Sequence, residues 1–169
     1  MEKKLNFLKN VFLFQGIEEE FIKELLNDMT EKNYEKGIDI IKEGEKGSDL
    51  FFLFSGEVSI SKRMTLFEEI AGINHVDKSL IKLKDTDYAF FGEMALCGGK
   101  DIRSATVTTE SKCILGELKA DSILKLINKH DKLAHYFYKN LSNVLADRLR
   151  IANRNILKLT TALTLALEE

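Results

Sequence analysis

The stretch FGEMALCGGKDIRSATV, residues 91–107, places a glutamate and an arginine on either side of a glycine-rich turn in an otherwise apolar run. A buried carboxylate or guanidinium is costly unless it is paired or bound to a ligand. The free N–H groups that begin a short helix, next to Gly92, form an anion site, and Arg103 can add a bidentate clamp. An ionised Glu93 only accepts hydrogen bonds, so its natural ligand is a hydroxyl. The stretch therefore predicts a site for a sugar hydroxyl beside a phosphate, as in a ribose cyclic phosphate.

Length, charge and cysteine content limit the alternatives. The 169 residues suffice for one domain with an appended element. Lys and Arg number 25 against 27 Asp and Glu, so no global basic excess indicates nucleic-acid binding. Cys97 and Cys113 are too few for a disulfide framework, which favours a reduced, cytoplasmic setting. The sequence predicts neither a signal peptide nor a membrane span, because no apolar run approaches the roughly 20 residues needed.

The spacing of apolar residues changes along the chain. Residues 3–29 carry apolar side chains at steps of three and four, which predicts two short helices. From Tyr34 to about Leu118, short β-branched and aromatic runs alternate with glycines, which indicates antiparallel β structure. The predicted strands are 38–42, 50–54, 58–62, 79–84, 104–109 and 112–117.

A long helix is predicted from about residue 132 to near the end, after a short helical element at 123–127. Apolar residues recur in it at steps of four and three over three heptads, with Arg148 and Asn153 on either flank. The regular repeat favours pairing with a second copy of the chain over packing on the β structure. These residues, called the seam below, are Leu145, Leu149, Ala152, Ile156, Leu159, Leu163 and Ala166.

Two motifs in the β region resemble the two signatures of the cyclic nucleotide-binding domain, the family that includes the catabolite activator protein and protein kinase A regulatory subunits. The first is IIKEGEKGSDLFFLFSG at 40–56, where glycines punctuate apolar runs. The second is the stretch at 91–107, with Phe-Gly-Glu at its start and Arg-Ser-Ala near its end. Two motifs in the right order are a more specific signal than one. With its flanking helices, the resemblance covers nearly the whole chain.

The resemblance implies an α+β fold. Its centre is a small antiparallel β-barrel of the double-stranded β-helix or jelly-roll type, flanked by N-terminal helices and a long C-terminal helix. The chain is expected to divide into 1–130, the barrel with its N-terminal helices, and 131–169, the long helix that serves as lid and dimerisation element. Because the chain ends soon after that helix, no helix-turn-helix and no direct DNA binding are expected.

The resemblance also implies roles for individual residues. Glu93 is expected to bind the ribose 2′-hydroxyl and Arg103 the exocyclic oxygens of the cyclic phosphate. Further donors are the Ser104 hydroxyl and the backbone N–H groups of Ala95 and Ala105. The predicted ligand-binding residues are Phe91, Gly92, Glu93, Met94, Ala95, Arg103, Ser104, Ala105 and Asn153.

Three features depart from or extend the family pattern. By resemblance, Ala152 and Asn153 on the long helix are placed where the family meets the purine, and the Asn153 amide can pair with an adenine N6/N7 edge. Ile102 stands where the family has proline, which removes a rigid turn and predicts weaker affinity. The segment before Gly92 is longer than usual, and an enlarged hairpin is predicted around 66–77.

The sequence thus predicts a ligand-sensing regulatory module with cAMP favoured over cGMP, acting as a homodimer on an unknown downstream protein. No catalytic triad, metal site or cofactor site is recognised, so no enzymatic activity is expected. The alternative is a dimeric interaction module that keeps the fold but binds no ligand. In that case Glu93 and Arg103 are expected to pair with each other.

Overall fold

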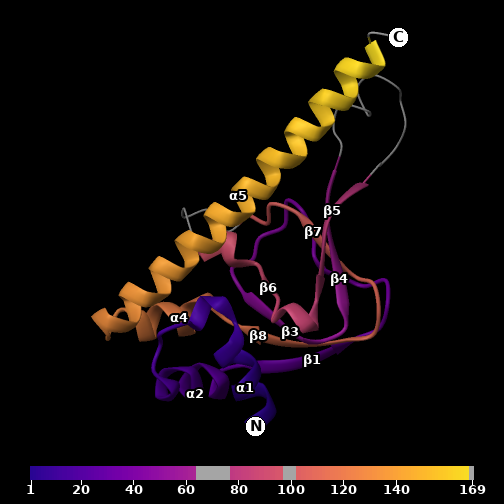
Figure 1. Ribbon diagram of the computed structural model, residues 1–169. Helices are drawn as coiled ribbons and strands as arrows, with labels where there is room; N and C mark the ends of the chain where they lie inside the picture. Colours follow the sequence, from indigo (N-terminus) through magenta and orange to yellow (C-terminus); the bar gives the residue numbers. More distant parts are fainter. Residues whose placement is uncertain (64–76, 97–101, 168–169) are drawn as a thin grey trace.

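The computed structural model describes residues 1–63, 77–96 and 102–167 (Figure 1). Helices lie at both ends of the chain and strands between them, as the apolar pattern predicts. The helical elements are α1 (Glu2–Asn10), η1 (Phe12–Phe14), α2 (Glu19–Asn27), η2 (Asp85–Asp87), η3 (Glu93–Leu96), α4 (Ala120–Ile127) and α5 (Asp131–Leu167). The strands are β1 (Thr30–Tyr34), β2 (Asp39–Ile41), β3 (Leu50–Ser55), β4 (Glu57–Arg63), β5 (Asp77–Lys84), β6 (Phe90–Phe91), β7 (Thr106–Thr109) and β8 (Cys113–Leu118).

The described strands form two antiparallel sheets, ordered β1-β8-β3-β6 and β2-β7-β4-β5. Side chains of both sheets meet in one apolar cluster, which includes Phe51 and Leu115 from the first sheet and Val58 and Val107 from the second. This packing confirms the predicted α+β fold with an antiparallel β centre. In the described residues the strands make two packed sheets, and a single closed barrel is not formed.

Two strands, β1 and β6, are not predicted by the pattern of apolar residues in the sequence. β1 is polar and mostly exposed, so no apolar alternation marks it. Backbone pairing with β8 holds it, from Thr30 opposite Glu117 to Tyr34 opposite Cys113. β6 has two residues, too short for a periodicity, and pairs with Phe51 and Phe52 of β3. Both strands therefore depend on pairing with strands distant in the sequence.

The helices gather into a second apolar cluster at one end of the sheets (Figure 1). It joins α1, α2 and α4 to the first third of α5, through Leu133, Phe137 and Leu141. The buried Asn140 fixes α5 to the loop around η1, because its Nδ2 donates to the carbonyl oxygens of Leu13 at 3.1 Å and Gln15 at 2.7 Å. The start of α5 is thereby anchored, while the division of the chain after residue 130 stays a prediction.

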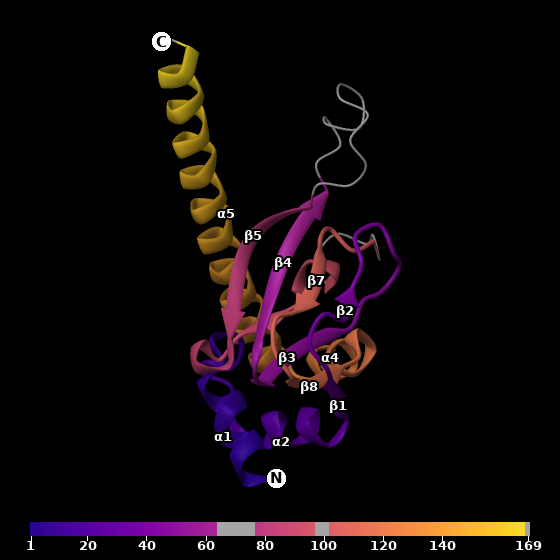
Figure 2. The same ribbon diagram turned by 90° about the vertical axis from the view of Figure 1, so that its right-hand side faces the viewer.

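The rest of α5 runs past the sheets to the end opposite the N-terminal helices (Figures 1 and 2). From Leu149 onward its described residues are exposed. The seam residues Leu149, Ile156, Leu159 and Leu163 are 54–61% exposed. Packing of this part of the seam on the sheets of the same chain is therefore excluded.

In the part of the chain that the structure describes, no helix is both long enough and apolar enough to cross a membrane. The predicted hairpin enlargement at 66–77 lies, up to residue 76, outside the described residues. The turn at 98–100 and Cys97 also lie outside them.

Candidate ligand-binding site

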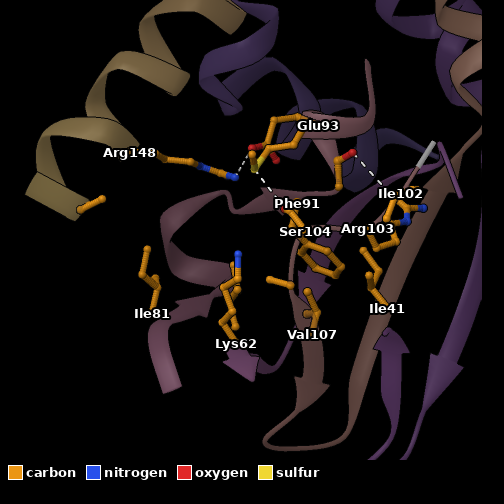
Figure 3. Close-up of a pocket in the computed structure, with 15 residues that line it drawn as sticks. Ile41, Lys62, Ile81, Phe91, Glu93, Ile102, Arg103, Ser104, Val107 and Arg148 are labelled. Carbon is orange, nitrogen blue, oxygen red and sulfur yellow. Dashed lines mark hydrogen bonds and ion pairs between the residues drawn. The ribbon is translucent and has the colours of Figure 1, made fainter. Parts of the chain in front are cut away.

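A cavity of about 400 Å³ lies against the sheet β2-β7-β4-β5, between η3 and the middle of α5 (Figure 3). Its charged side chains come from four separate parts of the chain: Lys62 from β4, Glu93 from η3, Arg103 from the segment before β7, and Arg148 from α5. The remaining lining residues are Ile41, Ile60, Ile81, Phe91, Gly92, Met94, Ile102, Ser104, Ala105, Val107 and Ala152. The site thus combines an apolar wall with a few charges, which is typical of small-molecule sites.

Gly92 sets the direction of the turn that carries Glu93. Its φ is +90°, and a Cβ atom there would lie 2.6 Å from the carbonyl oxygen of Asp49. Any other residue would be strained and would collide with that backbone, so glycine is required. The chain then enters η3 with Glu93 as its first residue, near the predicted single helical turn.

Glu93 is buried, with an exposed fraction of 1%. Its Oε1 accepts a hydrogen bond from Nη1 of Arg148, and the two side chains form an ion pair. Its Oε2 is buried and accepts no hydrogen bond from the described residues. A buried acceptor without a donor is costly, so this oxygen fits a ligand hydroxyl that donates to it.

Arg148 connects the turn to α5. Besides Glu93, it donates from Nη2 to the carbonyl oxygen of Phe90 at 3.0 Å, and its guanidinium lies 5.6 Å from the centre of the Phe90 ring. These contacts tie the middle of α5 to both sides of Gly92. Arg148 is therefore a direct side-chain link between Glu93 and α5.

Arg103 is held at the other end of the cavity, with 8% of the residue exposed. Its Nη1 donates to the carbonyl oxygens of Asp49 at 3.0 Å and Gly92 at 3.4 Å. Gly47 leaves room for the guanidinium, since a Cβ atom there would lie 2.9 Å from Nε. Among the described residues, no carboxylate is within ion-pairing distance of Arg103. The guanidinium is thus held by backbone carbonyls without a direct ion pair, which leaves it suited to bind an anionic ligand.

Burial is the main cause of the pKa shifts of Arg103 and of the nearby Asp49. It lowers the pKa of the Arg103 guanidinium, while the carboxylates of Asp49 and Glu117 oppose that shift. Burial also raises the pKa of the Asp49 carboxyl; Glu117 adds to this rise, and Arg103 counteracts it. The positive charge of Arg103 is therefore moderated by two acids that lie outside the cavity lining.

The backbone beside Arg103 is fixed although Ile102 replaces the family's proline. The Arg103 N–H donates to the Glu45 carbonyl at 2.8 Å, and the Gly44 N–H donates to the Arg103 carbonyl at 2.9 Å. Ile102 itself forms an isolated antiparallel bridge with Lys46. The loop of the first motif thus positions the arginine of the second.

The structure brings most of the predicted site residues together. Phe91 through Met94 and the run from Arg103 to Ala105 all line the cavity, and the Ser104 hydroxyl contacts the Met94 sulfur at 3.2 Å. Ala95 lies in η3. Asn153 is exposed and is not among the lining residues, whereas its neighbour Ala152 is. The pair between Glu93 and Arg103 that the ligand-free alternative implies is not formed, and Glu93 pairs with Arg148 instead.

Sequence reasoning missed Arg148 and Lys62 as residues of the site. A signal for Arg148 was present, because it lies one helical turn before Ala152, which was expected near the ligand. Lys62 follows Val58 and Ile60 at steps of two on β4, so the strand periodicity places it on the same face. In both cases the sequence indicated the face of the helix or strand on which the residue lies, but not the residues that it contacts.

The comparisons with known proteins agree with this geometry. The cyclic nucleotide-binding domain family matches residues 31–130, and the chain belongs to this family. The cGMP-dependent protein kinase egl-4 of Caenorhabditis elegans is 31% identical over 133 residues, 76% of this chain and 15% of that protein. The human cGMP-dependent protein kinase 2 is 29% identical over 171 residues, 97% of this chain and 21% of that protein. The chain thus spans about a fifth or less of the length of these relatives.

Solved structures show the same fold. The catabolite activator protein of Thermus thermophilus superposes with a TM-score of 0.68 at 27% identity, covering 88% of this chain and 63% of that chain. The cAMP-bound PfPKA-R superposes with a TM-score of 0.62 at 32% identity, covering 74% of this chain and 40% of that chain. A cyclic nucleotide-binding domain from Methylobacillus flagellatus reaches 0.74 at 22% identity, covering 93% and 82%. The regulatory binding domain is therefore the part of these proteins that this chain matches.

Proposed function

We propose that this chain is a regulatory module that senses a cyclic nucleotide and performs no chemistry on it. One observation carries the proposal: the buried, unpartnered Oε2 of Glu93 and the guanidinium of Arg103 border the same cavity. A 3′,5′-cyclic nucleotide offers a hydroxyl donor and a single negative charge on one fused ring. It therefore satisfies both groups with one rigid ligand.

In this proposal the cyclic phosphate lies at the Arg103 end, where the guanidinium binds its exocyclic oxygens. The Ser104 hydroxyl and the N–H groups of Ala95 and Ala105 add donors to the same phosphate. The ribose 2′-hydroxyl donates to Oε2 of Glu93. The base then extends along the apolar wall toward Ala152 of α5.

Signal transmission follows from the link between Glu93 and Arg148. A hydroxyl that donates to Glu93 competes with Arg148 for the negative charge of the same carboxylate. Ligand binding thereby shifts the balance between positions of α5, in proportion to the difference in affinity for those positions. Asn153, one turn beyond Leu149, reaches the purine in the ligand-bound position.

The exposed seam pairs with the seam of a second copy, giving a homodimer. Seven apolar residues at alternating steps of four and three suit a two-stranded coiled coil. Leu145 packs against the helical cluster of its own chain, and the exposure of the other six, from Leu149 onward, leaves room for a partner helix. The module passes its signal to another protein in the cytoplasm, and direct DNA binding is not part of the proposal.

The identity of the base stays open between two nucleotides. The sequence prediction favours cAMP, which is bound in the PfPKA-R structure, whereas the kinases compared above are named for cGMP. Both nucleotides carry the same ribose and cyclic phosphate. The groups that face Glu93 and Arg103 therefore do not separate them.

Titration calorimetry with cAMP and cGMP tests the proposal. We expect the wild-type chain to bind at least one of them, and Arg103→Ala to lose about 1.5–3 kcal/mol of binding free energy, since a charge-assisted contact is removed. The matched control is Arg150→Ala, an exposed arginine of α5 that pairs with Asp147. Absence of heat from either nucleotide would leave the second candidate, a dimeric interaction module without ligand.

A further inference from the structure

Lys62 is a charged residue of the cavity that the proposed contacts to ribose and phosphate do not use. It lies on β4, on the face of the strand that Val58 and Ile60 also occupy. Val58 is fully buried and Ile60 lines the cavity, so the strand pattern calls for a third apolar residue at this position. A lysine stands there instead.

The side chain points into the cavity. Figure 3 shows its nitrogen between Ile81 and Val107, directed toward the side where Glu93 and Arg148 lie. Its ammonium lies 4.0 Å from the Glu43 carboxylate, at the outer limit of an ion pair, and the side chain is 56% exposed. A loosely held, half-exposed ammonium can turn to a ligand without breaking a short contact.

The other two cations of the cavity are already engaged. Arg148 donates to Glu93 and to the Phe90 carbonyl, and Arg103 donates to two backbone carbonyls. Lys62 stands apart from both, on the β4 and β5 wall beside Ile60 and Ile81. This is the part of the cavity that remains for the base once the phosphate lies at Arg103.

An ammonium group donates three hydrogen bonds and accepts none. Guanine presents two neighbouring acceptors, N7 and O6, on one edge, whereas adenine presents the acceptor N7 beside the donor N6. A lysine therefore matches the guanine edge and opposes the adenine amino group. Ile60, Ile81 and Ala152, which line the cavity around Lys62, have apolar side chains, and the Glu43 carboxylate that pairs with Lys62 at 4.0 Å is not among the lining residues.

We infer that Lys62 reads the N7 and O6 edge of a guanine base, so that the site discriminates in favour of cGMP over cAMP. This inference rests on the proposed function, and it reverses the sequence prediction that cAMP is preferred. Asn153, the residue expected to read adenine, does not line the cavity, whereas Lys62 does. In this inference Lys62 of β4 decides between guanine and adenine, and a contact of Asn153 with the purine in the ligand-bound position does not.

Affinities of three nucleotides for the full chain test the inference. The probes are cGMP, cAMP and cyclic inosine monophosphate, which keeps N7 and O6 but lacks the 2-amino group of guanine. We expect cGMP to bind about tenfold more tightly than cAMP, and cyclic inosine monophosphate to bind within about threefold of cGMP. Cyclic inosine monophosphate with the affinity of cAMP would overturn the reading of O6, and tighter binding of cAMP would overturn the preference.

Two matched variants separate a direct contact from a general effect of charge. Lys62→Met is expected to abolish most of the preference by weakening cGMP about tenfold and leaving cAMP unchanged or slightly tighter. Lys82→Met removes the same charge from the neighbouring strand β5, where the lysine is 57% exposed and 3.9 Å from Glu57. Lys82→Met should keep the preference.

The possible failures are distinguishable. If the ratio of cGMP to cAMP affinity is the same in wild type and in Lys62→Met, the inference is wrong and the proposed function is unaffected. If Lys82→Met loses the preference too, the effect is one of general charge, and a specific contact between Lys62 and guanine is contradicted. Binding of none of the three nucleotides to the wild-type chain overturns the proposed function itself.

Discussion

The two ends of the cavity hold their charged residues in different ways. Arg103 is fixed by carbonyl oxygens of its own β structure, Asp49 and Gly92, and by the backbone bonds of its segment to the loop at 44–45. Glu93 is fixed by Arg148, a side chain 55 positions away on α5. One end is therefore held by backbone groups next to the sheets, and the other by a side-chain contact with α5.

Because of this difference, we expect one end of the cavity to contribute mainly to ligand affinity and the other mainly to the effect of a ligand on α5. Groups held by short backbone contacts lose little freedom when a ligand binds, so the phosphate end is preorganised. The end at Glu93, where the proposal places the sugar, is held by a pair whose partner belongs to another element, so the proposal expects a ligand there to alter the position of that element. We expect substitutions at the two ends to differ in kind, and the following measurements test that expectation.

The largest effect is expected at the sugar end when the hydroxyl itself is removed. The 2′-deoxy forms of cAMP and cGMP leave Oε2 of Glu93 without a donor, and we expect affinity to fall by about 1.5–3 kcal/mol in the wild-type chain. In Glu93→Gln, which keeps the shape but not the charge, the penalty for the deoxy ligand should shrink. Calorimetry measures, for each nucleotide, the four combinations of ribose or deoxyribose form with wild type or Glu93→Gln, and an equal penalty in both proteins would place the hydroxyl elsewhere.

At the phosphate end, Arg103→Lys keeps the charge but loses the planar fork. One ammonium cannot hold the Asp49 and Gly92 carbonyls and a phosphate with the same geometry, so we expect affinity to fall about tenfold. Arg150→Lys on the exposed face of α5 is the control. Unchanged affinity in Arg103→Lys would show that the fork has no role in binding.

Arg148→Met tests the link to the helix and should act mainly on stability. It leaves the Glu93 carboxylate buried without its cation, which we expect to lower the free energy of unfolding by about 2 kcal/mol. The double variant with Glu93→Gln should lose less than the sum of the single losses, because the two residues interact. Urea unfolding measures both quantities, with Arg150→Met as the control, and strict additivity would contradict the coupling.

The acid beside Arg103 predicts a smaller, pH-dependent effect. Burial raises the pKa of Asp49, so this carboxyl takes up a proton at higher pH than an ordinary aspartate. Protonation removes a negative charge near Arg103, and a bound phosphate favours that state, so affinity should rise as pH falls. We expect a gain of about two- to threefold between about pH 7 and pH 4.5.

Two variants isolate the contribution of Asp49 in calorimetric titrations over that pH range. Asp49→Asn should bind more tightly at neutral pH and lose the gain at low pH. Asp121→Asn, which removes an exposed acid from α4, should retain it. A gain that persists in Asp49→Asn would assign the pH dependence to other groups.

The smallest effect on affinity is expected from the seam. Ile156→Asp places a charge in the proposed helix pair, so we expect light scattering to show a monomer where the wild type is a dimer. Affinity for the nucleotide should change less than about threefold, because the ribose and phosphate contacts belong to one chain. Lys158→Asp, which lies opposite the seam, should leave the dimer intact, and a monomeric wild type would refute the pairing.

Much of the fold was readable from the sequence because it depends on local periodicity. The predicted strands at 50–54 and 58–62 correspond to β3 and β4, and the long helix begins within one residue of its predicted start. β1 was not readable, because its stability comes from pairing with β8 about 80 positions later and not from an apolar face. The same holds for β6, which is too short to show a period.

The site was readable in part for a similar reason. Gly92, Glu93 and Arg103 lie in one stretch whose residue types are costly without a ligand, and the structure gathers them at one cavity. Arg148 and Lys62 could not be predicted as site residues, because each lies in a regular helix or strand where a charged side chain is ordinary and no binding motif marks it. The Glu93–Arg103 pair of the ligand-free alternative is not formed, because the cation in contact with Glu93 is Arg148 of α5 and not the arginine nearer in the sequence.

By itself, the sequence determined the antiparallel β character of the centre, the glycine turn with its acid and base, and a long helix with a regular apolar stripe. These are properties of short segments, in which one residue constrains the next few through backbone geometry and periodicity. Only the tertiary structure decided that α5 delivers Arg148 to the acid and that β4 turns a lysine inward. Such contacts depend on how whole helices and strands pack against one another. The periodicity of a sequence indicates which face of an element a residue occupies, but not which other element packs against that face.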